Sequence, residues 1–139
     1  MNIALLGYGK MGKAIERLAL EAGHQVGLRI DADNLEDLTA EKLGRADVAI
    51  EFSRPESAFD NIRFCLELDV PVVSGTTGWL EHLPEAKTLC RVHGGAFLYA
   101  SNFSIGVNLF FALNHFLARL MDGQPQYDAA IKEVHHTQK

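Results

Sequence analysis

Six residues near the N-terminus, Gly7-Tyr8-Gly9-Lys10-Met11-Gly12, match the pattern G-x-G-x-x-G. At this spacing Gly7 would allow a tight turn, Gly9 a close approach of the backbone to a diphosphate, and Gly12 the packing of a helix on a strand. A helix that starts at such a turn presents N–H groups and a partial positive charge to an anion. The motif predicts a dinucleotide site if a strand precedes it and a helix follows it. The alternative is a glycine-rich turn that binds nothing.

Asp31 lies nineteen residues after Gly12, close to the spacing of about 20 residues typical of a carboxylate that binds the 2′-hydroxyl of a ribose. The same carboxylate would repel the 2′-phosphate of NADP, and Asp33 would add to that repulsion. No Arg follows Asp31, although Arg29 or Lys10 could soften the discrimination. We therefore expect NADH to be preferred to NADPH. The alternative is that Asp31 is only a solvated turn residue.

Three titratable side chains, His135, His136 and Lys139, lie within five residues at the C-terminus. Histidine suits acid–base chemistry because its ordinary pKa of about 6.5 is near physiological pH, and lysine is a compact cation that is also an acid. On a strand, His135 and His136 would point to opposite faces, so the pair is poorly placed to bind one metal ion. The segment predicts proton transfer or binding of a carboxylate, and no metal site.

Strand-like and helix-like segments alternate along the chain and would position these groups. The expected strands are 3–6, 25–30, 47–52, 70–73 and 96–99, and the expected helices are 10–22, 55–68 and 79–92. Between them, 32–45 is polar and weakly helical. This alternation predicts an α/β fold, a Rossmann-like doubly wound parallel sheet with helices on both faces.

The last third of the sequence has a different pattern. A helix over 104–122 is apolar on most sides, so we expect it to be deeply covered, between two domains. After a turn at 122–125, the segment 127–136 alternates like a strand. We therefore expect a dinucleotide-binding domain over 1–124, and over 125–139 the first strand of an α+β substrate-binding domain that is cut short.

Composition excludes several classes of function. With 47% hydrophobic residues and a formal net charge of -5, the 139 residues can bury one core but have no basic field for nucleic acid or anionic membranes. Apolar stretches are far shorter than the roughly 20 residues that span a bilayer, and no charged leader follows Met1. Cys65 and Cys90 lack a CxxC spacing, which favours buried thiols in a reducing compartment. We expect a cytoplasmic protein.

Four segments, in this order, resemble those of the 4-hydroxy-tetrahydrodipicolinate (dihydrodipicolinate) reductases: Glu51–Pro55, Ser74–Gly78, Ser101–Asn108 and Glu133–Lys139. The resemblance covers the whole chain, and the last two segments are its specific ones. Two positions depart from the family pattern. Ser101 stands where proline is frequent, and Glu51 stands where aspartate is usual, which we do not expect to affect the function.

The resemblance implies three sets of cofactor contacts, each after a strand. They are Phe52, Ser53 and Arg54 near the adenosine and its ribose; Gly75, Thr76 and Thr77 at the nicotinamide, through hydroxyl and backbone groups; and Ala100, Ser101, Asn102 and Phe103 on the other side of the nicotinamide. The carboxyl edge of an open α/β sheet is where such folds bind ligands. For Ser74–Gly78 the alternative is a turn that caps the next helix, and Arg54 alone could be a surface charge.

The resemblance also implies the reaction. A hydride would pass from NAD(P)H to a ring carbon of a small cyclic imine dicarboxylate, with net loss of water, in diaminopimelate and lysine biosynthesis. Lys139 would donate the proton, His135 would be its acid–base partner, and His136 would bind a substrate carboxylate or hydroxyl. The full-length protein would be a homo-oligomer.

In the family, the position of Lys139 is followed by an Asp-Ala-Pro-Ser-Gly-Thr segment that holds a carboxylate, and then by most of the substrate-domain sheet. We therefore expect this chain to be part of a longer protein and to be inactive by itself. Two alternatives stay open: a cofactor-binding fragment without turnover, and an NAD-dependent dehydrogenase of the homoserine or semialdehyde type. The histidine segment argues against the second.

Overall fold

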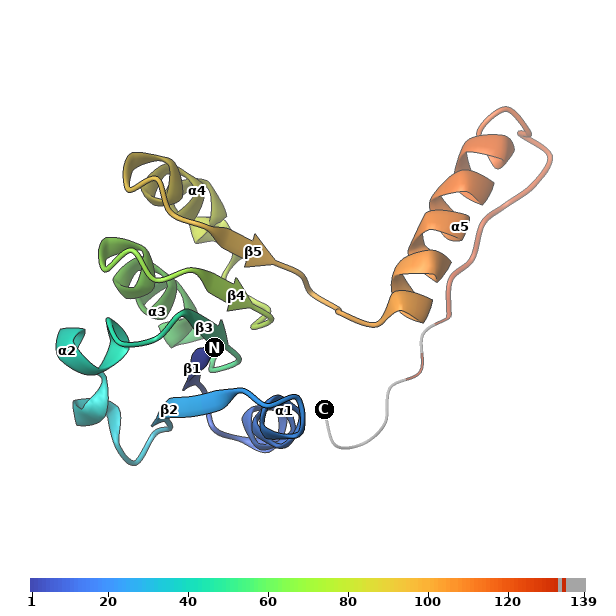
Figure 1. The fold of residues 1–139 in the computed structure, drawn as a ribbon. Coiled ribbons are helices and arrows are strands. Elements are labelled where there is room, and N and C mark those ends of the chain that lie inside the picture. The colour runs from blue at the N-terminus through green and yellow to red at the C-terminus, as the bar shows by residue number, and fades with distance from the viewer. Residues whose placement is uncertain (133, 135–139) are drawn as a thin grey trace. The chain divides into compact units, whose positions relative to one another are not determined.

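The structure, a computed structural model, describes residues 1–132 and 134. The chain divides into two compact units, Met1–Ser101 and Asn102–Lys139 (Figure 1). The first unit holds a five-stranded sheet and its helices, and the second holds one long helix. The expected domain boundary after residue 124 stays a prediction.

The sheet of the first unit is wholly parallel. Its strands are β1 (Asn2–Leu6), β2 (Gln25–Ile30), β3 (Val48–Glu51), β4 (Val72–Ser74) and β5 (Phe97–Tyr99). They lie in the order β2-β1-β3-β4-β5, with β3 at the centre. From β1 the chain therefore adds β2 on one side of β1, and then adds β3, β4 and β5 on the other side. Loops at the carboxyl ends of β1 and β3 separate at such a switch point, which is where open α/β sheets bind ligands.

Helices cover both faces of this sheet, as the alternating pattern predicted (Figure 1). They are α1 (Lys10–Glu21), α2 (Ala40–Leu43), α3 (Pro55–Glu67) and α4 (Leu83–Val92), with 3-10 turns η1 (Leu35–Asp37) and η2 (Leu80–His82). α1 packs on one face, and α2, α3 and α4 pack on the other.

The main core lies between the sheet and α3. Alternate residues of the strands, such as Leu6, Leu28 and Ala49, point to this side because side chains alternate along a strand. α3 begins at Pro55, whose missing N–H is not needed in the first turn. Its buried residues recur at three- and four-residue steps, as predicted: Ala58, Ile62, Cys65 and Leu66.

The opposite face is only partly covered within the first unit. Register places Leu5, Ile50, Val73 and Leu98 in one row across the sheet. Leu5, next to α1, is 1% exposed, whereas Leu98 at the far edge is 56% exposed. Within residues 1–101, all of them described, only α1 contributes helical residues to the core on this side.

One predicted helix begins later than expected. Instead of a helix from Trp79, the chain forms η2 and then α4 from Leu83, with Pro84 in the first turn. A helix from Trp79 would place Pro84 in its interior, where the ring removes a hydrogen bond and collides with the preceding turn. The side chain of Trp79 is buried, and its indole N–H donates to the carbonyl of Thr76 at 2.7 Å.

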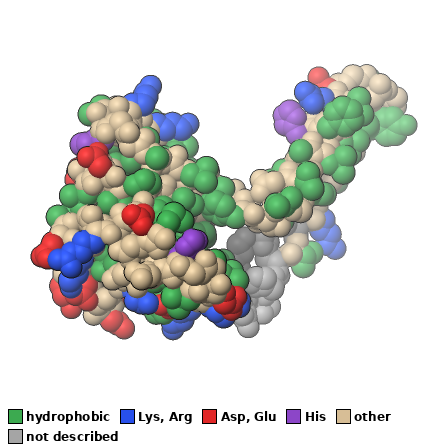
Figure 2. Space-filling model, in the orientation of Figure 1, with side chains coloured by type: hydrophobic (Ala, Val, Ile, Leu, Met, Phe, Trp, Pro, Cys, Tyr) green, Lys and Arg blue, Asp and Glu red, His purple; other side chains and the backbone are tan. Residues whose placement is uncertain are grey.

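The second unit contains α5 (Ile105–Met121), which starts at Ser104, whose hydroxyl accepts from the N–H of Val107 at 3.4 Å. The expectation that this helix is deeply covered between two domains stays a prediction. None of its residues is buried, and hydrophobic side chains lie along its surface (Figure 2). Among the described residues of its own unit, 127–131 line a cavity along it, and these five residues are too little chain to cover a helix that is apolar on most sides.

The expected strand over 127–136 does not form in its described residues, 127–132 and 134. A strand is stable only when its backbone groups pair with a neighbouring strand, and the five strands found all belong to the first unit. Residues 133 and 135–139 lie outside the described residues, so His135, His136 and Lys139 stay predictions. In the described part of the chain no helix combines the length and apolarity needed to cross a bilayer.

Candidate functional site

The glycine loop follows β1 and leads into α1, the context that the motif requires. Gly7 has a φ of +100°, and a Cβ there would lie 2.1 Å from the carbonyl oxygen of Phe52. A Cβ on Gly12 would lie 2.3 Å from the carbonyl oxygen of Gly7. A Cβ on Gly9 would meet nothing within 4 Å. The fold itself therefore requires Gly7 and Gly12, whereas Gly9 borders open space at the N-terminus of α1.

A polar network ties this loop to α1 and β2. The hydroxyl of Tyr8 donates to the carboxylate of Glu16, and Nε of Arg29 donates to the same carboxylate at 2.6 Å. The hydrogen bond from Arg29 is the main reason why the pKa of Glu16 lies below its ordinary value. The hydrogen bond that Tyr8 donates to Glu16 has the opposite effect on Tyr8 and raises the pKa of its hydroxyl. Arg29, which could have softened discrimination against NADPH, is thus paired with Glu16.

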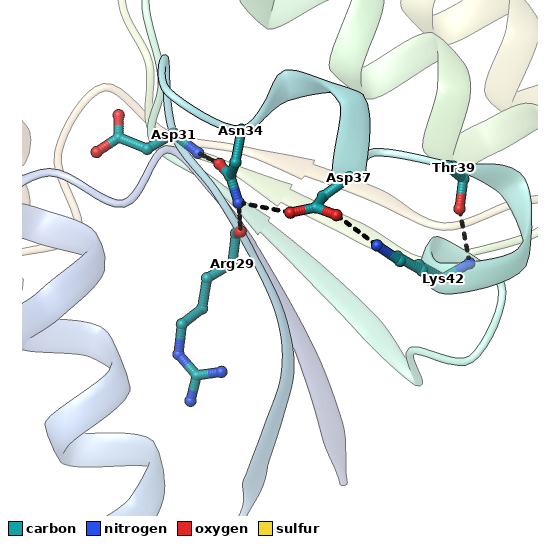
Figure 3. A network of polar contacts seen from close by, with 6 residues as sticks. All are labelled: Arg29, Asp31, Asn34, Asp37, Thr39 and Lys42. Atoms are coloured by element: carbon teal, nitrogen blue, oxygen red, sulfur yellow. Dashed lines mark hydrogen bonds and ion pairs between the residues drawn. The ribbon is translucent and has the colours of Figure 1, made fainter.

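The turn after β2 presents the carboxylate of Asp31 to solvent (Figure 3). Asn34 holds this turn: its Oδ1 accepts from the N–H of Asp31 at 2.8 Å, and its Nδ2 donates to the carbonyl of Arg29 at 2.9 Å. Nδ2 of Asn34 also donates to Asp37, whose pKa is lowered, chiefly by its hydrogen bond from Lys42. Asp31 therefore stands at the end of β2 on a fixed turn, and its side chain points away from the network.

A cleft of about 610 Å³ opens between these turns. Its lining residues are Gly7, Ile30, Asp31, Ala32, Leu35, Ser53, Arg54, Glu56, Ser57 and Asn61. Of the predicted cofactor contacts, Gly7, Asp31, Ser53 and Arg54 are among them. Sequence reasoning missed the others, although Ser57 and Asn61 lie four residues apart, the spacing of one helix face.

The predicted contacts that follow β3 and β4 lie against each other. The ring of Phe52 occupies the space where a side chain at position 75 would be, since a Cβ on Gly75 would lie 2.2 Å from it. Thr76 is buried, and its hydroxyl donates to the carboxylate of Glu51 at 2.9 Å. The Thr76 hydroxyl is thus used inside the protein, whereas Thr77 is exposed.

Glu51 is also close enough to influence a thiol. Cys65, in the last turn of α3, is fully buried, and this burial raises the pKa of its thiol to about 12, with a smaller contribution from the negative charge of Glu51. Cys90 is half-buried, and its Sγ donates to the carbonyl of Gly95 at 3.2 Å.

The described residues contain no cluster of three or more His, Cys, Asp or Glu side chains that could hold a metal ion.

The other predicted contacts fall at the junction of the units. Ala100 and Ser101 follow β5 in the first unit, and the N–H of Ala100 donates to the carbonyl of Ser74 at 3.2 Å. This bond places Ala100 at the same edge as the β4 loop. Asn102 and Phe103 belong to the second unit, where Oδ1 of Asn102 accepts from the N–H of Ser104 at 2.8 Å.

Comparison with known families decides the relationship that the four segments suggested. Residues 1–103 match the family described as "Dihydrodipicolinate reductase, N-terminus". The chain belongs to the dihydrodipicolinate reductase family. The resemblance predicted from the sequence is confirmed.

Named relatives agree. The chain is 48% identical over 139 residues to the 4-hydroxy-tetrahydrodipicolinate reductase of Christiangramia forsetii, which covers all of this chain and 57% of the relative. It is 36% identical over 124 residues to the enzyme of the same name from Neisseria gonorrhoeae, covering 89% of this chain and 45% of the relative. The chain thus spans about half the length of the curated relatives it matches.

Solved structures share the fold. A dipicolinate-bound dihydrodipicolinate reductase from Paenisporosarcina sp. TG-14 matches with a TM-score of 0.72 at 24% identity, over 85% of this chain and 53% of that one. A putative homoserine dehydrogenase from Archaeoglobus fulgidus matches with a TM-score of 0.58 at 20% identity, over 71% and 42%. At identities this low, the two matches establish the fold alone. That shared fold confirms the predicted Rossmann-like sheet.

Proposed function

We propose that this chain is the cofactor-binding part of a 4-hydroxy-tetrahydrodipicolinate reductase, which reduces that cyclic imine dicarboxylate with loss of water in diaminopimelate and lysine biosynthesis. The family match over 1–103 and the names of the relatives support the reaction. A cytoplasmic location and a homo-oligomeric full-length protein belong to the same proposal.

The observation that carries cofactor binding is the open space at Gly9. Gly7 and Gly12 are explained by contacts inside the fold, but no internal contact explains a glycine at position 9. A diphosphate at the N-terminus of α1 would explain it, because the backbone there must come close to the phosphates. Adenosine and its ribose would lie in the cleft between Asp31 and Arg54.

A preference for NADH over NADPH belongs to this proposal. Asp31 stands exposed at the end of β2 and lines the cleft, where its carboxylate can accept hydrogen bonds from a ribose 2′-hydroxyl. The nearby cation of Arg29 is paired with Glu16 and so does not offset the repulsion of a 2′-phosphate. Lys10, the first residue of α1, is a second cation in this part of the sequence and could soften the discrimination.

The nicotinamide would lie at the loops after β4 and β5, near Gly75, Thr77 and Ala100. Bound NADH supplies the hydride. Lys139 would donate a proton to the substrate, with His135 as its acid–base partner and His136 on a substrate carboxylate or hydroxyl. Cationic side chains suit a substrate that carries two carboxylates.

Titration of the chain with NADH, followed by the fluorescence of the reduced nicotinamide, tests cofactor binding. We expect saturable binding, weaker for NADPH, and no saturable change would refute the proposal. A second candidate is a cofactor-binding fragment without turnover, which is favoured by the length of the chain, about half that of its relatives. Adding substrate to a full-length version separates the two, because a protein that only binds the cofactor would leave NADH unoxidised there as well.

A further inference from the structure

A buried carboxylate lies beneath the two loops that follow β3 and β4. Glu51 ends β3, the central strand, and is 0% exposed. Its Oε1 accepts hydrogen bonds from the backbone N–H of Ser53 at 2.9 Å, from the hydroxyl of Ser53, and from the hydroxyl of Thr76 at 2.9 Å. Its Oε2 accepts from the hydroxyl of Ser74 at 2.7 Å. One side chain thus gathers donors from both loops.

The hydroxyl of Thr76 closes a ring with these groups. It accepts from the N–H of Ser53 at 2.9 Å and donates its hydrogen to Glu51. A threonine hydroxyl has only one hydrogen to donate, so this one is used inside the protein. Because Thr76 is also buried, its hydroxyl is poorly placed to bind a cofactor directly. The side chain that sequence reasoning assigned to the nicotinamide therefore joins one loop to the other.

A second contact joins the same loops. The ring of Phe52 lies against Gly75, leaving no room for a Cβ there, and the N–H of Gly75 donates to the carbonyl of Glu51 at 2.9 Å. The carbonyl of Phe52 in turn lies against Gly7. A displacement of the β3 loop would therefore displace the β4 loop and the glycine loop with it.

We propose that Glu51 and Thr76 are positioning residues that, with Ser53, form a buried clasp holding the β3 and β4 loops as one rigid cofactor-facing edge. This inference rests on the proposed function for what the edge binds. A carboxylate suits the centre of the clasp because it only accepts hydrogen bonds and has room for several. Glutamine would bring an amide donor to a place where donors already converge.

The first test measures the affinity of the chain for NADH in single and double variants. Thr76→Val keeps the shape of the side chain but loses its hydroxyl, and Thr76→Ser keeps the hydroxyl. We expect Thr76→Val and Glu51→Gln each to raise the Kd about tenfold, and Thr76→Ser to change it less than about twofold. The double variant Glu51→Gln/Thr76→Val should be no weaker than the weaker single one, because both changes open the same clasp.

A direct contact between Thr76 and the cofactor predicts a different result. If the Thr76 hydroxyl touched the cofactor directly, Thr76→Val would weaken binding while Glu51→Gln left it unchanged, and that outcome overturns the clasp. Glu67→Gln is the matched control, since Glu67 ends α3 on the surface and its ion pair among the described residues is a long one, with Arg63 at 3.9 Å. It makes the same chemical change outside the clasp, and its NADH affinity should equal that of the unchanged chain.

The second test needs no cofactor. Amide hydrogen exchange over 52–54 and 75–77 should accelerate together in Glu51→Gln and Thr76→Val, with protection retained in β1 and α1. Acceleration throughout the chain would mean that the clasp only stabilises the fold, and unchanged exchange would mean that it holds nothing; either overturns the proposal. If the unchanged chain binds no NADH, the proposed function fails while this test still decides the clasp. If Glu51→Gln does not fold, the Thr76→Val and Thr76→Ser pair decides it.

Discussion

The glycines of the nucleotide loop face different surroundings, and this allows folding and binding to be separated at single residues. Gly9 borders open space, so Gly9→Ala should leave the free energy of unfolding nearly unchanged. Its added methyl group should nevertheless lower NADH affinity, about tenfold or more, because it stands where the phosphates must approach. Urea unfolding and NADH titration of the same sample measure the two effects.

Gly7→Ala provides the contrast. Its Cβ would overlap the backbone of Phe52, and its φ of +100° is strained for any residue but glycine. The loss of unfolding free energy should be about 3 kcal/mol or more. A Gly9→Ala chain that unfolded as easily as Gly7→Ala would show that position 9 has an internal role and would remove the main support for a dinucleotide.

Asp31 carries the proposed choice between the two nicotinamide cofactors. Asp31→Ala should weaken NADH binding about tenfold, the value of a lost hydrogen bond to a charged group, and should strengthen NADPH binding by removing repulsion. Asp33→Ala is the neighbouring control and should leave NADH affinity unchanged. Parallel titrations with the two cofactors measure the ratio. An unchanged ratio in Asp31→Ala would place cofactor choice elsewhere.

At the scale of elements, the Tyr8–Glu16–Arg29 network links the glycine loop, α1 and β2 and should make stability depend on pH. In the folded chain the pKa of Glu16 is lowered, mainly by its hydrogen bond from Arg29. A carboxylate whose pKa is lowered by folding stabilises the fold at pH values above its unfolded pKa of about 4.3. This stabilisation is lost as the pH falls through the folded pKa. The difference in unfolding free energy between the unchanged chain and Glu16→Gln should therefore be constant near neutrality and shrink below pH of about 4.

Urea unfolding at a series of pH values measures this difference. Glu21→Gln is the matched control on the same helix, because Glu21 forms an exposed pair with Arg17 at 2.9 Å. Exposed pairs of this kind contribute little, so its difference should be small at every pH. A Glu16→Gln difference that did not change on acidification would show that the network contributes nothing through charge.

The elements of the first unit were largely predictable because their signals are local. Alternating apolar residues marked the strands, Pro55 marked the start of α3, and the glycine motif marked the turn between β1 and α1. The errors arose where a local pattern meets a larger constraint. Pro84 delayed α4, and the expected strand over 127–136 has no partner strand among the described residues.

The candidate site was predictable in place but less so in function. The carboxyl ends of parallel strands gather at one edge, which brought Gly7, Asp31 and Ser53 to one cleft as expected. The departure at Glu51 was expected to have no effect, yet this residue holds two loops. Its partner Thr76 lies 25 residues away in sequence, and no pattern within a single strand or helix reports such a contact.

At the scale of the whole molecule, the proposed cofactor site and the proposed proton donor belong to different parts of the chain. The described cleft lies within Met1–Ser101, whereas Lys139 is the last residue. In a full-length version, Lys139→Ala should abolish turnover and leave NADH affinity nearly unchanged, because it removes the proposed proton donor but no cofactor contact. Steady-state kinetics beside NADH titration measure both. Retained turnover would remove Lys139 from its proposed role.

Burial of Cys65 gives the molecule an internal reporter of its own opening. A thiol reacts with alkylating reagents as the thiolate, and a pKa of about 12 keeps this one protonated while the fold is intact. In a Cys90→Ser chain, iodoacetamide at pH 8 should therefore label position 65 only while the core between β3 and α3 is open, and urea should accelerate labelling in step with unfolding. Because alkylation is slow compared with reclosing of the fold, the rate at which mass is gained would then report the fraction of molecules whose core is open, without a dye.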